Sequence, residues 1–202
     1  DGRSELDFES WTALGAKKKI KKFSFETEAQ VRMKENSSTL DQYMLNLNTE
    51  FQIAKPVSFG FGYRYLHKNK RDGLEAGQRF HVDLNTGFKA NRVKFIGRVR
   101  YQEKYELGTN NPHGTDKMRF KAGIGYNIKN WKLDPEFSAE LFHQFYVGRS
   151  ANQKIRYTLR TKYKVKGSGS YSGFYRFERS LNDIGPFGTT THILGLRYTF
   201  KM

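Results

Sequence analysis

The chain contains no cysteine, only four prolines and no long apolar run. The lack of cysteine excludes disulfides, thiolate nucleophiles and cysteine-based metal sites. No stretch approaches the roughly 18 consecutive apolar residues of a transmembrane helix, so we expect none. The sequence begins at Asp1 without a basic and apolar leader, so we expect that any secretion signal has already been removed.

Acidic residues are few compared with basic ones. The chain has 20 Asp and Glu against 36 Lys and Arg, which gives a formal net charge of +16. Such an excess often indicates nucleic-acid binding. Here the basic residues are spread along the chain, and the sequence contains no zinc finger, helix-turn-helix pattern or arginine-rich tail. We therefore expect no nucleic-acid partner.

What the sequence does contain is strict alternation of apolar and polar residues. Successive side chains of a β-strand point to opposite faces, so such a segment is apolar on one side and charged on the other. We find no sustained helical period. Eleven segments alternate in this way: residues 6–17, 23–34, 42–53, 57–68, 79–89, 93–105, 118–128, 133–145, 154–165, 170–179 and 191–200.

This pattern predicts an all-β protein, a single transmembrane antiparallel β-barrel domain of 10–12 strands over residues 1–202. Bacterial single-chain barrels have an even number of strands, and eleven segments are present. Segments two to eleven would close as ten antiparallel strands, and residues 1–17 would then be tucked in or lie at the seam. A missed twelfth strand is the other alternative.

The connections between segments alternate in length. Outer-membrane barrels have short periplasmic turns and longer extracellular loops. We therefore expect the longer set to face outward. The short connections are residues 18–22, 54–56, 90–92, 129–132 and 166–169, and the longer ones are residues 36–41, 69–78, 106–117, 146–153 and 181–190.

The apolar faces indicate what surrounds the barrel. We expect Arg179 to be the only Asp, Glu, Lys or Arg on these faces. Aromatic residues gather near the segment ends and aliphatic residues near the middle, as in aromatic girdles around a lipid-facing band. A soluble barrel or sandwich also alternates, but it gives no cause for this sorting. The sequence therefore predicts an integral protein of the bacterial outer membrane.

The opposite faces form the predicted lumen, where basic residues outnumber acidic ones. Closure would bring acidic and basic walls together, so that they pair across the lumen and leave an excess of bases that attracts anions. The predicted basic track comprises Arg64, Arg98, Arg100, Arg119, Lys121, Arg156, Arg160 and Lys162, and its acidic partners are Glu26, Glu28, Glu50, Glu136 and Glu140.

Two functions remain open on this evidence. A narrow pore would pass small anionic solutes, because the planar guanidinium of arginine binds carboxylates with two hydrogen bonds. Alternatively, the charged groups form an ion-pair network that fills a non-conducting structural or accessory subunit of a larger outer-membrane complex. Eight-stranded barrels are filled by side chains and barrels of 16–18 strands leave a channel, so 10–12 strands suit either function.

The loop-side bases have a separate expected role. At that level they would contact phosphates of outer-membrane lipids, including lipopolysaccharide. The predicted contact residues are Lys68, Lys70, Arg71, Lys117, Arg149 and Arg179.

Catalytic and metal-binding patterns are weak. The segment from His143 to Ser150 lacks the His-x-Ser arrangement of outer-membrane phospholipase, and a pairing of His113 with Asp116 is the only protease-like alternative. A surface hydrolase is thus the weakest function considered. We expect no enzyme activity, no catalytic residues, no metal and no cofactor.

Two stretches resemble known proteins. The last segment, Gly195-Leu-Arg-Tyr-Thr-Phe200, resembles the C-terminal signal recognised by the barrel-assembly machinery, which implies that machinery as a partner during insertion. The N-terminal third resembles a family of small, uncharacterised outer-membrane barrels common in Bacteroidota. The resemblance implies the barrel fold and outer-membrane location without an established activity. The matching strings are Trp11-Thr-Ala-Leu-Gly15, Glu28-Ala-Gln-Val-Arg32, Leu40-Asp-Gln-Tyr43 and Gly62-Tyr-Arg-Tyr65.

The size and the basic lumen are also similar to those of the oligogalacturonate and sialic-acid porins. This similarity is one of architecture, without a shared motif. It implies acidic sugars as solutes.

Overall fold

The computed structural model describes residues 6–70, 73–108, 115–146, 149–181 and 190–202. No helix among these residues is long and apolar enough to cross a membrane. The strands are β1 (Leu6–Ile20), β2 (Phe23–Lys34), β3 (Thr39–Ala54), β4 (Val57–Lys70), β5 (Gly73–Ala90), β6 (Val93–Glu106), β7 (Thr115–Tyr126), β8 (Asp134–Tyr146), β9 (Arg149–Val165), β10 (Gly169–Ser180) and β11 (Thr190–Lys201).

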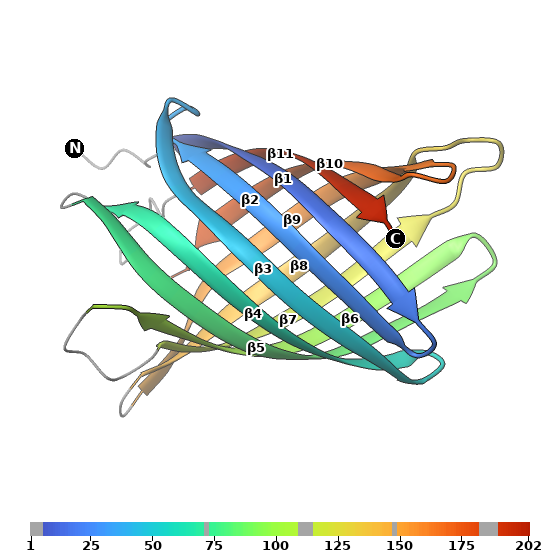
Figure 1. The fold of residues 1–202 in the computed structure, drawn as a ribbon, viewed down its shortest axis with the longest axis horizontal. Helices are drawn as coiled ribbons and strands as arrows, with labels where there is room; N and C mark the ends of the chain where they lie inside the picture. Colours follow the sequence, from blue (N-terminus) through green and yellow to red (C-terminus); the bar gives the residue numbers. More distant parts are fainter. Residues whose placement is uncertain (1–5, 71–72, 109–114, 147–148, 182–189) are drawn as a thin grey trace.

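The eleven strands close into one barrel, in the order β1-β11-β10-β9-β8-β7-β6-β5-β4-β3-β2 (Figure 1). Neighbours in sequence pair antiparallel, whereas β1 pairs with β11 in parallel, from Leu6 opposite Thr190 to Lys17 opposite Lys201. The prediction of a barrel of 10–12 strands is confirmed, and the first segment is a seam strand. The alternative prediction, in which the other ten strands close an antiparallel barrel without the first segment, is wrong, because β1 lies between β2 and β11.

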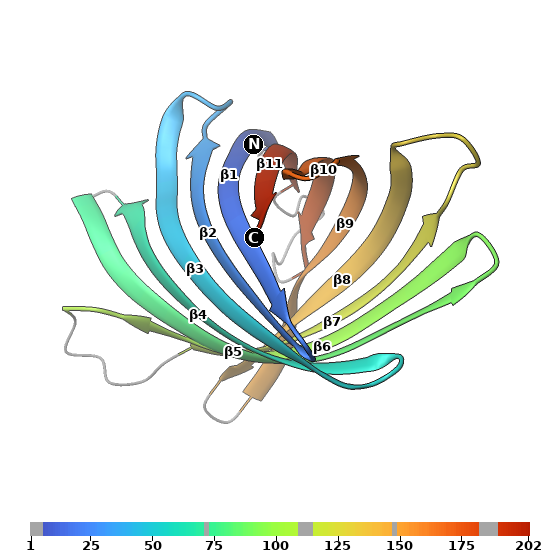
Figure 2. The ribbon, with the colours of Figure 1, turned by 45° about the vertical axis from the view of Figure 1, so that its right-hand side comes forward.

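The parallel seam follows from the odd number of strands. The chain crosses the barrel eleven times, so β1 and β11 both run from the long-connection end to the short-turn end (Figures 1 and 2). We call these the loop end and the turn end. The N-terminal end of β1 therefore lies at the loop end, and the C-terminus lies at the turn end.

The turn end is built from residues that accept the left-handed backbone conformation. Lys21, Asn91 and Asn130 have φ angles of 52°, 55° and 62°, as tight hairpin turns require. At the loop end the strands continue further than predicted, because Gly73 to Ala76 pair with Lys70 to His67. The glycine and charged residues that suggested a loop over 69–78 thus largely extend a hairpin.

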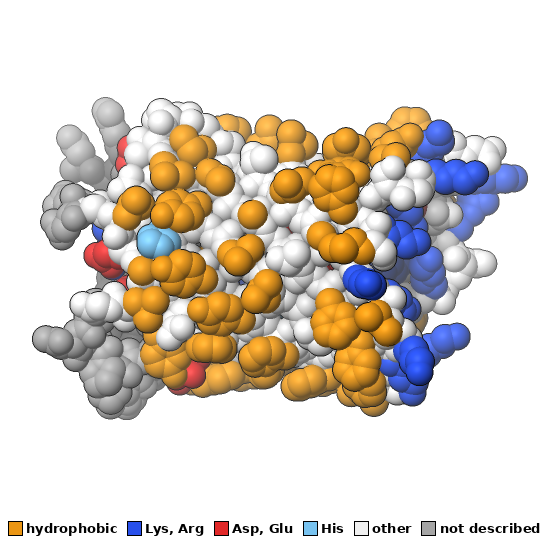
Figure 3. All heavy atoms as spheres, viewed as in Figure 1, with side chains coloured by type: hydrophobic (Ala, Val, Ile, Leu, Met, Phe, Trp, Pro, Cys, Tyr) orange, Lys and Arg blue, Asp and Glu red, His pale blue; other side chains and the backbone are white. Residues whose placement is uncertain are grey.

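The outer face is apolar, and hydrophobic side chains cover the middle of the barrel (Figure 3). Leu47, Leu84 and Leu196 are 47%, 53% and 65% exposed. Buried hydrophobic side chains face inward instead, and Trp11, Phe174 and Ile193 form one cluster. The barrel therefore has the polarity expected from the alternation.

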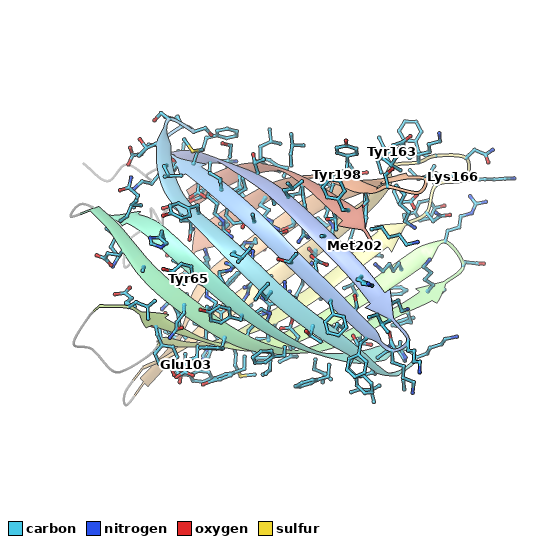
Figure 4. All side chains as sticks on the ribbon, in the orientation of Figure 1. Tyr65, Glu103, Tyr163, Lys166, Tyr198 and Met202 are labelled. Carbon is cyan, nitrogen blue, oxygen red and sulfur yellow. The ribbon has the colours of Figure 1, made fainter. Side chains whose placement is uncertain are left out.

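Two acidic residues depart from this pattern. Glu103 lies opposite Phe80 and Asp116 in the strand register, which places Glu103 and Asp116 on the outer face toward the loop end (Figure 4). The prediction that Arg179 is the only charged outward residue is therefore wrong. Residues 101–105 are Tyr-Gln-Glu-Lys-Tyr, so both faces are polar where β6 leaves the apolar band. Arg179 itself lies on the outer face near the loop end, as predicted.

Candidate functional site

The interior of the barrel holds the predicted basic track, and Glu140 is its most connected carboxylate. Arg98 Nη2 lies 2.5 Å from Glu140 Oε1, Arg119 donates to both oxygens at 3.1 and 2.8 Å, and Arg156 Nη1 lies 3.6 Å from Oε2. Only 5% of Glu140 is exposed. Three strands, β6, β7 and β9, are therefore tied to β8 through one buried side chain.

Further ion pairs follow the wall of the barrel. Arg100 on β6 makes a two-point contact with Asp83 on β5 at 2.6 and 2.7 Å. Glu136 on β8 accepts from Arg160 on β9 at 2.5 Å and lies 3.7 Å from the Lys94 ammonium. Each pair joins adjacent or next-adjacent strands.

The expectation that acidic and basic walls pair across the lumen is therefore not met by these pairs. Side chains opposite one another on neighbouring strands start only about 5 Å apart, so they meet before either reaches the far wall.

The other predicted acidic residues have different partners. Glu26 and Glu28 both contact Arg197 on β11. Glu50 accepts a hydrogen bond from Ser58 on β4. Arg64 donates to Asn46 Oδ1 at 2.5 Å, whereas Lys121 and Lys162 make no ion pair with a described residue.

Two carboxylates outside the predicted partner set complete the network. Asp83 pairs with Arg100, and Glu178 on β10 pairs with Arg156 and Lys154 on β9. Both lie on inward positions, which alternation predicts. Their partners depend on which strands are neighbours and in what register, and this information comes only from the paired sheet.

Aromatic rings fill the middle of the interior together with these charges. Trp11 and Phe174 pack edge to face with 6.2 Å between their ring centroids. Arg119 and Arg156 lie 4.4 and 4.8 Å from the centroid of Phe142. Trp11 and Phe142 are 4% and 6% exposed, so side chains fill much of the centre of the barrel.

A glycine on β11 makes room for this packing. Gly195 lies between Trp11 and Phe174 in the strand register. A Cβ atom added there would stand 2.0 Å from Cζ of Phe174. The absent side chain is thus what allows the Phe174 ring to lie against the wall beside Trp11.

The exposure of the charged side chains varies along the barrel. Near the centre, the Arg119 and Glu140 side chains are 10% and 6% exposed. Toward the turn end, Lys17 and Lys94 are 45% and 46% exposed. The interior therefore narrows from a basic vestibule to a packed centre.

The turn end carries a rim of exposed bases, visible as blue side chains gathered at one end of the molecule in Figure 3. None of these residues makes an ion pair with a described residue. The rim makes this end strongly electropositive. Its members are Lys18, Lys19, Lys21, Lys22, Lys55, Lys89, Arg92, Lys129, Lys132, Lys164, Lys166 and Lys201.

The predicted lipid-phosphate contacts occupy several positions. Lys68, Lys70 and Lys117 lie on the inner face near the loop end, in line with the inward Leu66 and Arg119. Arg179 lies on the outer face. Arg71 and the side chain of Arg149 fall outside the described residues.

One of these lysines is paired at the loop-end rim. Lys70 contacts Glu75 and lies 3.4 Å from Glu106. Hydrogen bonding to Glu75 is the main cause of a raised pKa at Lys70, and hydrogen bonding from Lys104 is the main cause of a lowered pKa at Glu106. The contacts at the loop end thus favour the charged forms of Lys70 and Glu106.

His143, the described histidine considered for catalysis, packs edge to face against Phe145. Its Nδ1 is 2.9 Å from Asn152 Oδ1. His113 and the Ser150 side chain fall outside the described residues. Within the described ranges, no group of three or more His, Asp or Glu is placed to hold a metal ion.

Comparison with protein families supplies the classification. A family model described as a protein of unknown function, DUF2490, matches residues 8–184, from β1 to beyond β10. The chain belongs to the DUF2490 family. A search of curated proteins found no match to it. The DUF2490 match agrees with the expected membership of an uncharacterised family, and it includes the central residues Trp11, Glu140 and Arg156.

Proposed function

We propose that this DUF2490 protein is an integral outer-membrane β-barrel whose basic interior passes small anions at low conductance. The observation that carries the proposal is the charge of the interior, where arginine and lysine exceed the carboxylates available to pair with them. Its turn end would face the periplasm and its loop end the outside.

The distribution of apolar surface supports membrane embedding. Large hydrophobic side chains are exposed around the outer face, while carboxylates and arginines are buried inside. Tyr65 lies toward the loop end and Tyr163 and Tyr198 toward the turn end, on either side of the apolar band (Figure 4). Aromatic side chains at both edges of such a band favour the two membrane–water interfaces. The outward Arg179 would then reach lipid phosphates, including those of lipopolysaccharide.

A charge placed on the apolar band tests this embedding. Leu47 lies in the middle of β3, and Leu47→Arg is expected to lower the unfolding free energy in lipid vesicles by about 2–4 kcal/mol. Ile53→Arg, near the turn end of the same strand, is expected to cost at most about 1 kcal/mol. Urea titrations of vesicle-folded protein give both values. Equal costs at the two positions would argue against a lipid-facing band.

The pairing of charges supports passage of anions. Glu140, Glu136 and Asp83 are each held by arginine. Lys121 lies opposite Glu140 and Lys162 opposite Asp134 in the strand register, but neither lysine forms an ion pair with a described residue. Fixed positive charge along a narrow path concentrates anions and repels cations. Because side chains fill much of the centre of the barrel, we expect the conductance to be low.

Single-channel recording in planar bilayers tests the passage. With a potassium chloride gradient, the reversal potential is expected to show a preference for chloride over potassium. Lys121→Gln/Lys162→Gln should reduce that preference, because two unpaired positive charges leave the path. Glu103→Gln, on the outer face, is the matched control and should leave it unchanged. A preference for cations would contradict the proposal.

A second function has an observation in its favour. The 4% exposure of Trp11 and 6% exposure of Phe142 leave the centre filled, as in a non-conducting accessory subunit of an outer-membrane complex. Absence of current from folded, reconstituted protein, together with a stable co-purifying outer-membrane protein, would favour this alternative over a pore.

A further inference from the structure

Four arginines in the loop-side part of the interior have no carboxylate partner among the described residues. Arg32, Arg64, Arg79 and Arg176 come from β2, β4, β5 and β10. None of them takes part in the ion pairs that hold Arg98, Arg100, Arg119, Arg156 and Arg160. Carboxylates neutralise the second set of arginines, whereas no described carboxylate forms an ion pair with the first set.

Arg64 and Arg79 form one side of this group. They lie directly opposite each other on β4 and β5, and Lys104 on β6 is the next residue in the same row. Like charges in directly opposite positions destabilise a sheet. Arg64 donates to the neutral Asn46, and Arg79 Nε is buried without a hydrogen-bond partner. Nothing in the described wall compensates this pair.

Arg32 and Arg176 form the other side, around Trp11. Their guanidinium carbons lie 3.5 and 4.8 Å from the centroid of the indole ring, and Arg176 also lies 4.0 Å from that of Phe174. Arg32 donates to Gln30 at 2.9 and 3.1 Å, whereas Arg176 Nε is buried without a partner. Aromatic faces attract these cations but do not neutralise their positive charge.

The nearby carboxylates are already engaged. Glu9 accepts from the Trp11 indole at 2.7 Å, and Asp41 accepts from Gln42 at 2.8 Å. Glu178 is held by Lys154 and Arg156. None of these three carboxylates forms an ion pair with Arg79 or Arg176.

The charges on the two sides also act on each other. Arg64 is repelled by Arg79 and Arg32, and Arg32 by Arg79 and Arg156. Arg176 is repelled by Arg156 and Arg32 and attracted by Glu178 and Glu140, and Arg32 is likewise attracted by Glu178 and Glu9. Arg32 and Arg176 converge on the Trp11 ring, and Arg64 and Arg79 face each other on neighbouring strands. Buried polar groups normally have partners, so unpaired ones call for a missing acceptor.

We infer that these four arginines bind a small oxyanion carrying two or three negative charges. Phosphate and small di- or tricarboxylates share the required chemistry, since each presents pairs of oxygens to the planar fork of a guanidinium. Arg79 and Arg176 would donate from the two sides, with Arg64 and Arg32 adding charge. The inference rests on the basic interior of the proposed function, but it holds whether or not ions pass through.

Thermal unfolding of the purified barrel in neutral detergent tests the site. Inorganic phosphate at pH 8, citrate and sodium chloride are compared at equal ionic strength. A bound ligand at about one hundred times its Kd should raise Tm by roughly 5 °C or more relative to chloride. A rise with phosphate alone supports a phosphate site, and a rise with citrate alone supports a polycarboxylate site. No rise beyond that of chloride overturns the inference.

A matched pair of variants separates a ligand site from a structural role. Arg79→Gln/Arg176→Gln should weaken binding of the stabilising oxyanion at least tenfold by isothermal titration calorimetry. In ligand-free, low-salt buffer it should be at least as stable as the unchanged chain, because repulsion is relieved. Lys55→Gln/Lys129→Gln removes the same charge from the turn end and should change the affinity less than twofold.

Two results would overturn the site. One is unchanged affinity in Arg79→Gln/Arg176→Gln, and the other is an equal loss in Lys55→Gln/Lys129→Gln, which would indicate a general effect of net charge. If the double arginine variant does not fold, Arg79→Lys keeps the charge without the fork, and it should still lose affinity. Binding without conductance would disprove anion passage and leave this site in place, whereas conductance without binding would do the reverse.

Discussion

Glu140→Gln is expected to lower the unfolding free energy of the barrel by about 3–5 kcal/mol, the usual cost of removing one partner from a buried ion pair. Glu140 is the shared acceptor of Arg98, Arg119 and Arg156. The amide keeps the shape but loses the charge, so three guanidinium groups are left facing one another in the interior. Urea unfolding of protein folded into vesicles measures the loss.

The control for this prediction removes the same charge from the outer face. Glu103→Gln should change the unfolding free energy by no more than about 0.5 kcal/mol, as at most surface positions. Adding Arg119→Gln to Glu140→Gln should cost less than the sum of the single changes, because it removes a guanidinium that has lost its acceptor. Full additivity would show that Glu140 does not act through Arg119.

Epitope tags at the two ends of the chain are expected to lie on opposite sides of the membrane. The parallel pairing of β1 with β11 places the start of β1 at the loop end and the end of β11 at the turn end. In intact cells, an antibody should reach a tag fused before β1. A tag fused after Met202 should react only after the outer membrane has been permeabilised.

Tags within the chain provide internal references. An epitope inserted between Glu35 and Asn36, in the β2–β3 connection, should behave like the N-terminal tag. One inserted between Lys129 and Asn130, in the β7–β8 turn, should behave like the C-terminal tag. Reaction of both terminal tags on the same side would show that an even number of strands crosses the membrane, and it would disprove the parallel seam.

The side on which each residue lies could be predicted from the sequence, because alternation with a period of two is local. Arg98, Arg119 and Arg156 lie on the inner face, and Leu47 on the outer one, as predicted. Where both faces are polar, as around Glu103, the pattern gives no such information and the prediction failed.

The sequence by itself determined the strands, their faces and the excess of positive charge inside. The tertiary structure alone decided the closure of β1 onto β11, the partners of Glu140, and the convergence of Arg32 and Arg176 on Trp11. Closure and register depend on residues far apart in the chain, whereas alternation depends only on the next residue. Which charges pair could therefore be known only from the strand register of the closed barrel.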